Sequence, residues 1–199
     1  MHPAKKDYSW IRHFESRHLR TASAISMVIA HAKQRKEIQL RDLIAGIYVA
    51  NFERILRFWP DAATFEDFVV EHCDWSEHRL STWDRWNYES QHPPRKIIPI
   101  PFSPWFFHMR RKNTFAGKMF SRSDDLKRVY ATAEEISPNK VAHAVGVIVP
   151  LITPELFLVA TARTDGIEFG TRLRDSGINL LLLEQVALQP LQQPDKLMF

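Results

Sequence analysis

The sequence has almost no cysteine. Cys73 is the single cysteine among 199 residues, so an internal disulfide is impossible and a cysteine-rich zinc site cannot form. Residues 1–10 also lack the apolar run that marks a signal peptide. We therefore expect a cytoplasmic protein that binds no metal.

Long apolar runs are missing as well. The most apolar stretch, residues 141–162, is interrupted by His143, Pro150, Pro154 and Glu155. A membrane-spanning helix needs about 20 consecutive apolar residues. We therefore interpret this stretch as two short buried helices and expect no membrane partner.

The motifs of common enzyme classes are absent. There is no Walker loop, no Gly-x-Gly-x-x-Gly and no Gly-x-Ser-x-Gly. The nine histidines are not spaced with carboxylates as metallohydrolases require, and the nearest approach to a metal set is His72-Cys73 with His78. His72 fits the apolar face of a helix better. We expect no catalytic residues and no cofactor.

Acidic residues are missing from one stretch of the chain. No Asp or Glu occurs from Ser90 to Ser123. Seven basic residues fall inside this acid-free stretch: Arg95, Lys96, Arg110, Arg111, Lys112, Lys118 and Arg122. The formal net charge of the whole chain is only +4. A local block of positive charge indicates an anionic partner more strongly than the total does.

Helical periodicity dominates the remaining sequence. Apolar residues recur at helical spacing over residues 22–35 and over residues 40–59, where Pro60 ends the pattern. Three further helices are expected to begin after Ser123, Ser137 and Thr153. The leucine-rich segment 178–188 is interpreted as a fourth, either a core element or a partner surface. These signals predict an all-α, multi-helix domain.

A helix-turn-helix-like unit is predicted within residues 64–88. Thr64 is expected to cap its first helix, Cys73-Asp74-Trp75 to form the turn, and Ser76 to cap the second helix. Polar side chains on the outer face of the second helix would then reach base edges or phosphates. The turn is one residue longer than the common form and lacks its glycine. A purely structural helical hairpin is therefore the alternative.

A proline-rich strap follows this unit. Pro93, Pro94, Pro99 and Pro101 favour extended backbone, so the strap is expected to lie on a surface. We divide the chain into an N-terminal helical arm (1–36), the helix-turn-helix-like unit with its basic strap (37–122) and a C-terminal helical region (123–199).

Ten residues are candidates for DNA binding. Those of the second helix would lie at the groove, and those of the strap and the basic segment after it would hold phosphates. The candidates are Ser76, His78, Arg79, Thr82, Arg85, Arg95, Lys96, Arg110, Arg111 and Lys112.

Four motifs in this region resemble a known family. They are Ser76 with Arg79-Leu80, Pro93-Pro94-Arg95-Lys96, Pro101-Phe102-Ser103-Pro104-Trp105-Phe106, and Phe115-Ala116-Gly117-Lys118-Met119-Phe120. Together they are similar to FlhC, the flagellar master transcriptional activator subunit, which has relatives on conjugative elements. The resemblance covers residues 65–130. It implies DNA binding and transcription activation in a hetero-oligomer with a small FlhD-like helical partner, which recruits RNA polymerase.

The sequence departs from that family in one respect. FlhC carries a C-terminal cluster of four cysteines that binds zinc, whereas this chain has no cysteine after Cys73. No zinc site can be carried over, and the chain would be a divergent, metal-free relative.

The sequence therefore predicts a DNA-binding transcriptional activator subunit. A helical protein–protein adaptor or assembly component is the alternative, in which the basic strap binds an acidic protein. An RNA-binding or nuclease module is a third interpretation.

Overall fold

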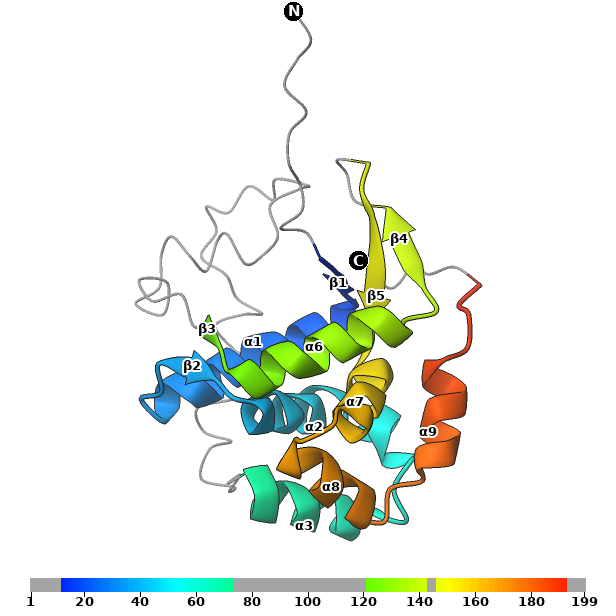
Figure 1. Ribbon diagram of the computed structural model, residues 1–199. Coiled ribbons are helices and arrows are strands. Elements are labelled where there is room, and N and C mark those ends of the chain that lie inside the picture. Colours follow the sequence, from blue (N-terminus) through cyan, green and yellow to red (C-terminus); the bar gives the residue numbers. More distant parts are fainter. Residues whose placement is uncertain (1–11, 74–120, 143–145, 193–199) are drawn as a thin grey trace, which may run out of the picture.

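The computed structural model describes residues 12–73, 121–142 and 146–192, and these are mostly helical (Figure 1). The helices are α1 (Arg17–Ala32), α2 (Leu40–Leu56), α3 (Ala62–Cys73), α6 (Asp124–Ile136), α7 (Pro154–Arg163), α8 (Glu168–Asp175) and α9 (Leu180–Ala187). The strands are β1 (Phe14–Glu15), β2 (Glu37–Ile38), β3 (Ser121–Arg122), β4 (Lys140–Ala142) and β5 (Ile148–Ile152). The predicted all-α class is thus confirmed in its helical content and wrong in omitting two small sheets.

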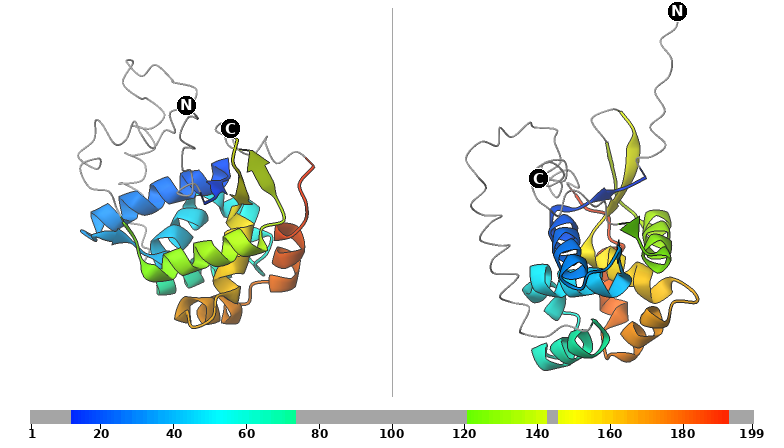
Figure 2. Two further views of the ribbon diagram at one scale, coloured as in Figure 1. Left: turned by 45° about the horizontal axis from the view of Figure 1, so that its top comes forward. Right: turned by 90° about the vertical axis from the view of Figure 1, so that its left-hand side faces the viewer.

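Helix α7 is the centre of the fold. Every residue from Pro154 to Ala162 is buried, and the helix lies in the middle of the helical body (Figure 2). The sequence predicts its start correctly, because Thr153 caps it by accepting a hydrogen bond from the amide of Leu156 at 3.3 Å. Glu155 is buried as well, and it pairs with Arg54 of α2. This ion pair joins α7 to α2.

Helices α1 and α2 pack at very close range. A Cβ atom at Gly46 would lie 2.3 Å from the carbonyl oxygen of Ala22, so the missing side chain permits the contact. Further along α2, Asn51 leaves helical geometry with φ −136° and ψ 24°. Its side-chain amide donates to the carbonyl oxygen of His18 at 3.3 Å. The two helices are therefore held by backbone proximity at one point and by a hydrogen bond at another.

The first half of the apolar stretch is a β-hairpin, not a helix. β4 and β5 are antiparallel, and β1 pairs with β5 in parallel to give the order β1-β5-β4. Ser137 does not begin a new helix but is the C-cap residue of α6, and its hydroxyl donates to the carbonyl oxygen of Leu151 at 2.9 Å. The hairpin has its own small core of Val141, Val149 and Leu151. Alternating β-branched residues therefore override the helix-start signal of Ser137-Pro138.

Pro150 is compatible with the middle of this sheet. The amide of Leu151 donates to the carbonyl oxygen of Asn139 at 2.9 Å, on the β4 side. Alternation along the strand turns the nitrogen of Pro150 to the other side. The missing N–H of Pro150 therefore costs no hydrogen bond with β4.

The start and the end of α3 both differ from the prediction. Asp61 caps the helix by accepting from the amide of Thr64 at 2.7 Å, so Thr64 lies inside the first turn. Cys73 is the last residue of the helix and is buried, and it does not belong to a turn. The inward positions of Phe65, Phe68 and Val69 match the expected apolar face.

The remaining helices agree with the sequence to different degrees. α6 is confirmed with its cap, since Ser123 accepts from the amide of Leu126 at 3.4 Å. α9 is confirmed as a helix, α1 begins earlier than expected at Arg17, and α8 was not predicted. One hydrophobic core unites side chains from α1, α2, α3, α6, α7, α8 and α9. The division of the chain into three segments stays a prediction.

The close approach of α1 and α2 gives a direct test. The change Gly46→Ala should lower the free energy of unfolding by about 1–3 kcal/mol, because the added methyl group meets backbone that cannot rotate away. Urea unfolding followed by circular dichroism measures this. Gly46→Ser should lose at least as much, and an unchanged unfolding midpoint for both variants would refute the proposed packing.

Candidate functional site

The residues predicted to bind DNA lie outside the described part of the chain. All ten fall within residues 74–120: Ser76, His78, Arg79, Thr82, Arg85, Arg95, Lys96, Arg110, Arg111 and Lys112. The predicted second helix and the proline-rich strap lie there too, so all of these stay predictions. The structure describes the two elements on either side, which are α3 ending at Cys73 and β3 beginning at Ser121.

The element before this segment is anchored by aromatic packing. Phe65 and Phe68 of α3 pack on Trp59, with ring centroids 4.7 and 5.1 Å apart. Cys73 is only 1% exposed, and burial raises the pKa of its thiol well above the ordinary value. Cys73 is therefore a protonated thiol within the hydrophobic core.

The element after the segment is anchored by an arginine that points into the body. Arg122 of β3 donates to Oε1 of Glu15 at 2.8 Å, and its guanidinium lies 3.9 Å from the ring centre of Tyr130. The same Oε1 accepts from the hydroxyl of Tyr130 at 2.5 Å, while Oε2 accepts from Ser23 at 2.8 Å. Arg122 belongs to the acid-free stretch of the sequence, yet a carboxylate already neutralises it.

A histidine and a second carboxylate extend this cluster. Nδ1 of His13 lies 2.7 Å from Oε1 of Glu134, and Nε2 lies 3.5 Å from Nη1 of Arg122. The imidazole also stacks on Tyr130, with centroids 4.8 Å apart and an interplanar angle of 14°. Arg12 pairs with the other oxygen of Glu134 at 3.0 Å. We call these seven residues the Glu15 network: Arg12, His13, Glu15, Ser23, Arg122, Tyr130 and Glu134.

Burial sets the ionisation of the Glu15 network. It lowers the pKa of His13 below the ordinary value and raises that of Tyr130 well above it. For Arg122, burial alone would lower the pKa, but Tyr130 and Glu15 reverse the effect and raise it. At neutral pH the network therefore holds a charged arginine, a neutral phenol and a neutral imidazole around Glu15.

The dominant role of Glu15 can be measured. The change Glu15→Gln removes the charge that faces Arg122 and replaces one of the two acceptor oxygens by an amide donor, so the free energy of unfolding should fall by about 1–3 kcal/mol. Chemical unfolding of the two proteins at neutral pH gives this difference. The matched control is Glu184→Gln, which breaks a half-exposed pair with Arg163. It should cost less than about 1 kcal/mol, and equal losses in the two variants would contradict the role given to Glu15.

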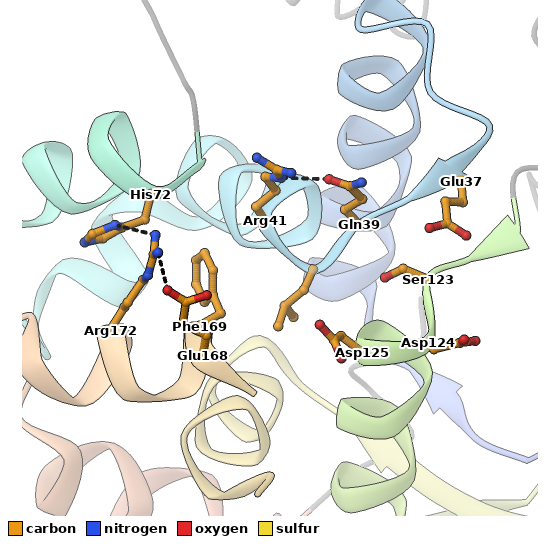
Figure 3. Close-up of a pocket in the computed structure, with 11 residues that line it drawn as sticks. Glu37, Gln39, Arg41, His72, Ser123, Asp124, Asp125, Glu168, Phe169 and Arg172 are labelled. Atoms are coloured by element: carbon orange, nitrogen blue, oxygen red, sulfur yellow. Dashed lines mark hydrogen bonds and ion pairs between the residues drawn. The ribbon is translucent and has the colours of Figure 1, made fainter. Parts of the chain in front are cut away.

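A separate polar pocket lies between the start of α2 and helices α6 and α8. It measures about 560 Å³ and is open to solvent (Figure 3). At one side of this pocket, Arg172 of α8 lies 2.5 Å from Glu168 and 3.4 Å from the ring of His72. A second pocket of about 410 Å³, between α3 and α8, shares His72 and Arg172 with the first. We call the two together the α3–α8 groove.

The α3–α8 groove is acidic. Seven carboxylate side chains line it, from Glu37, Asp67, Glu71, Asp124, Asp125, Glu168 and Asp175. Its arginines are Arg41 and Arg172. The groove therefore repels phosphates and attracts cationic groups. Sequence reasoning missed it, because its carboxylates come from four elements that are far apart in the chain, β2, α3, α6 and α8.

The outer face of α9 carries exposed leucines. Leu181 and Leu182 are 70% and 37% exposed, whereas Leu183 and Ala187 are buried. The two interpretations of the leucine-rich segment, core element and exposed surface, thus apply to opposite sides of one short helix.

The described part of the chain contains neither a membrane-spanning helix nor a cluster of metal-ligating side chains. No helix there combines the length and the apolarity needed to cross a membrane. Within residues 12–73, 121–142 and 146–192, no three His, Cys, Asp or Glu side chains gather as they would to hold a metal ion.

Comparison of the chain with models of protein families, with characterised proteins and with solved structures finds no match.

Proposed function

We propose that the chain is a DNA-binding subunit of a transcriptional activator, acting in a hetero-oligomer with a small helical partner. The observation that carries this proposal is the acid-free stretch from Ser90 to Ser123, which holds seven basic residues. Phosphate binding by such a block supplies affinity that does not depend on DNA sequence. Base contacts from the preceding residues would add sequence choice.

The anchoring of both flanking elements supports this proposal. Cys73 is buried where α3 ends, and Arg122 is bound by Glu15 where β3 begins. A connecting segment held at both ends by a packed scaffold is a common location for binding residues.

The phosphate-binding candidates are the five that the sequence predicts: Arg95, Lys96, Arg110, Arg111 and Lys112. Arg122 is not one of them, and its guanidinium donates to Glu15. We assign groove contacts to Arg79, Thr82 and Arg85, with Ser76 and His78 beside them. The acidic α3–α8 groove would repel a duplex, so DNA approaches a different face of the molecule.

The partners belong to the same proposal. The exposed side of α9, with Leu181 and Leu182, supports contact with a helical partner such as the FlhD-like subunit. Recruitment of RNA polymerase would follow from activator function. We propose a cytoplasmic location, because DNA, the helical partner and RNA polymerase are all found there.

Binding of the purified protein to DNA tests the proposed function. An electrophoretic mobility shift on a random duplex at two salt concentrations should show complex formation that weakens as salt rises. Absence of binding at low salt, together with binding to an acidic protein, would favour the adaptor function. Preference for single strands, or cleavage, would favour an RNA-binding or nuclease module.

The phosphate contacts predict a change in salt dependence. The double change Arg110→Ala with Arg111→Ala should weaken binding to every DNA sequence and reduce the slope of log K against log salt by about 2, since two counterions are no longer released. Titrations at several salt concentrations give the slope. The control removes two arginines from described surface positions, Arg163→Ala with Arg172→Ala, and should keep the slope of the unmodified protein. An unchanged slope for the Arg110 and Arg111 pair would exclude them as phosphate ligands.

The groove contacts predict a change in specificity. The change Arg85→Ala should reduce the difference in binding free energy between specific and random DNA by about 1–3 kcal/mol, the value of one bidentate base contact. A selected binding site and a scrambled duplex, titrated side by side, measure that difference. Equal weakening on both duplexes would show that Arg85 does not read bases.

A further inference from the structure

His13, the residue before β1, contacts both α6 and β3. Oε1 of Glu134 lies 2.7 Å from Nδ1 of His13. A carboxylate only accepts hydrogen bonds, so Nδ1 carries the hydrogen. In the neutral imidazole Nε2 is then an acceptor, and Nη1 of Arg122 lies 3.5 Å away as a donor. Neutral His13 thus joins α6 to β3 through its two nitrogen atoms.

Protonation would break one half of this bridge. A hydrogen on Nε2 would face the guanidinium of Arg122, which has no acceptor, and would place two cations next to each other. The attraction of protonated His13 to Glu134 would remain, but Arg12 also pairs with that carboxylate at 3.0 Å. The geometry therefore suits the neutral form and opposes the charged one.

Some of the surrounding charged and titratable groups raise the pKa of His13, and others lower it. They come from the segment before α1, from α1 itself, from β3 and from α6: Arg12, Glu15, Arg20, Arg122, Tyr130 and Glu134. Burial is the largest effect on His13, and with the charge of Arg122 it outweighs the attraction of Glu15 and Glu134, so the pKa of His13 is lowered. The stacking of His13 on Tyr130 maintains that burial.

We propose that the Glu15 network is a pH-dependent latch, in which neutral His13 holds β1 against α6 and β3, and protonation of His13 opens this contact. The direction follows from proton linkage. Because the pKa of His13 in the closed contact lies below the ordinary value of 6.5, an open form that exposes the imidazole binds the proton more tightly. The contact is fully stable above that value and weakens as the pH falls below it.

The latch predicts local opening at the two strands on acidification. The amide of Ser16 donates to Ile152 at 2.8 Å and that of Ser123 donates to Ile38 at 2.9 Å, so their hydrogen-exchange protection reports on β1 and β3. Between about pH 7.5 and pH 5.5 both protection factors should fall by about threefold or more, after correction for intrinsic exchange. The amide of Leu151, bonded to Asn139 on the β4 side, should keep its protection.

Two variants decide whether His13 causes the effect. His13→Asn cannot titrate, so the pH-dependent loss of protection should disappear. His72→Asn removes a histidine from the α3–α8 groove and should retain it. The same loss in His13→Asn as in the unmodified protein would overturn the latch. Where His13→Asn folds poorly, the NMR titration of the His13 ring in the unmodified protein decides, and its midpoint must match the midpoint of the protection change.

Discussion

The carboxylate of Glu15 is the interaction on which the arrangement around the basic segment depends. It lies on a two-residue strand that could not persist alone, and it accepts hydrogen bonds from Ser23 of α1, Arg122 of β3 and Tyr130 of α6. A partly buried carboxylate is tolerated only when its oxygens are satisfied and its charge is matched. Three donors from three elements meet both conditions. The N-terminal strand and the chain following residue 120 are therefore held at one place on the helical body.

This arrangement separates positive from negative charge along the chain. The acid-free stretch ends at Ser123, and Asp124 and Asp125 follow it at once in the first turn of α6, where they complement the helix dipole. These two carboxylates belong to the rim of the α3–α8 groove, together with residues from α3 and α8. Two carboxylates of the acidic groove thus follow the end of the basic stretch directly in the sequence. The groove repels a polyanion, which under the proposed function would favour one orientation of a duplex relative to the body.

Local signals in the sequence predict a large part of the helical fold. Ser123 and Thr153 cap α6 and α7 as expected, because a cap depends only on residues within one turn. Competing local signals caused the errors. Asp61 caps α3, although Thr64 is also a capping residue by type, and the start signal at Ser137-Pro138 competes with the strand alternation of Val141 and Val149.

The polar network could not be predicted, because its partners are far apart in sequence. His13 and Glu134 are separated by 121 positions, and Glu15 and Arg122 by 107. No periodicity links such residues, and only the packing of β1 and β3 near α6 brings them together. From the sequence alone, Arg122 is one of seven basic residues in the acid-free stretch, and nothing distinguishes it from the other six. The candidate DNA-binding residues depend on motifs within residues 74–120, and there the proposal relies on charge pattern and family resemblance.

The most direct test of the account is to map where a duplex contacts the protein. Ultraviolet cross-linking to bromodeoxyuridine-substituted DNA, followed by mass spectrometry of the linked peptides, gives that map residue by residue. We expect adducts between Ser76 and Lys112 and none on peptides that line the α3–α8 groove. Adducts concentrated on α3, α8 or the first turn of α6, or no adducts at low salt, would contradict the proposal that the basic segment binds DNA.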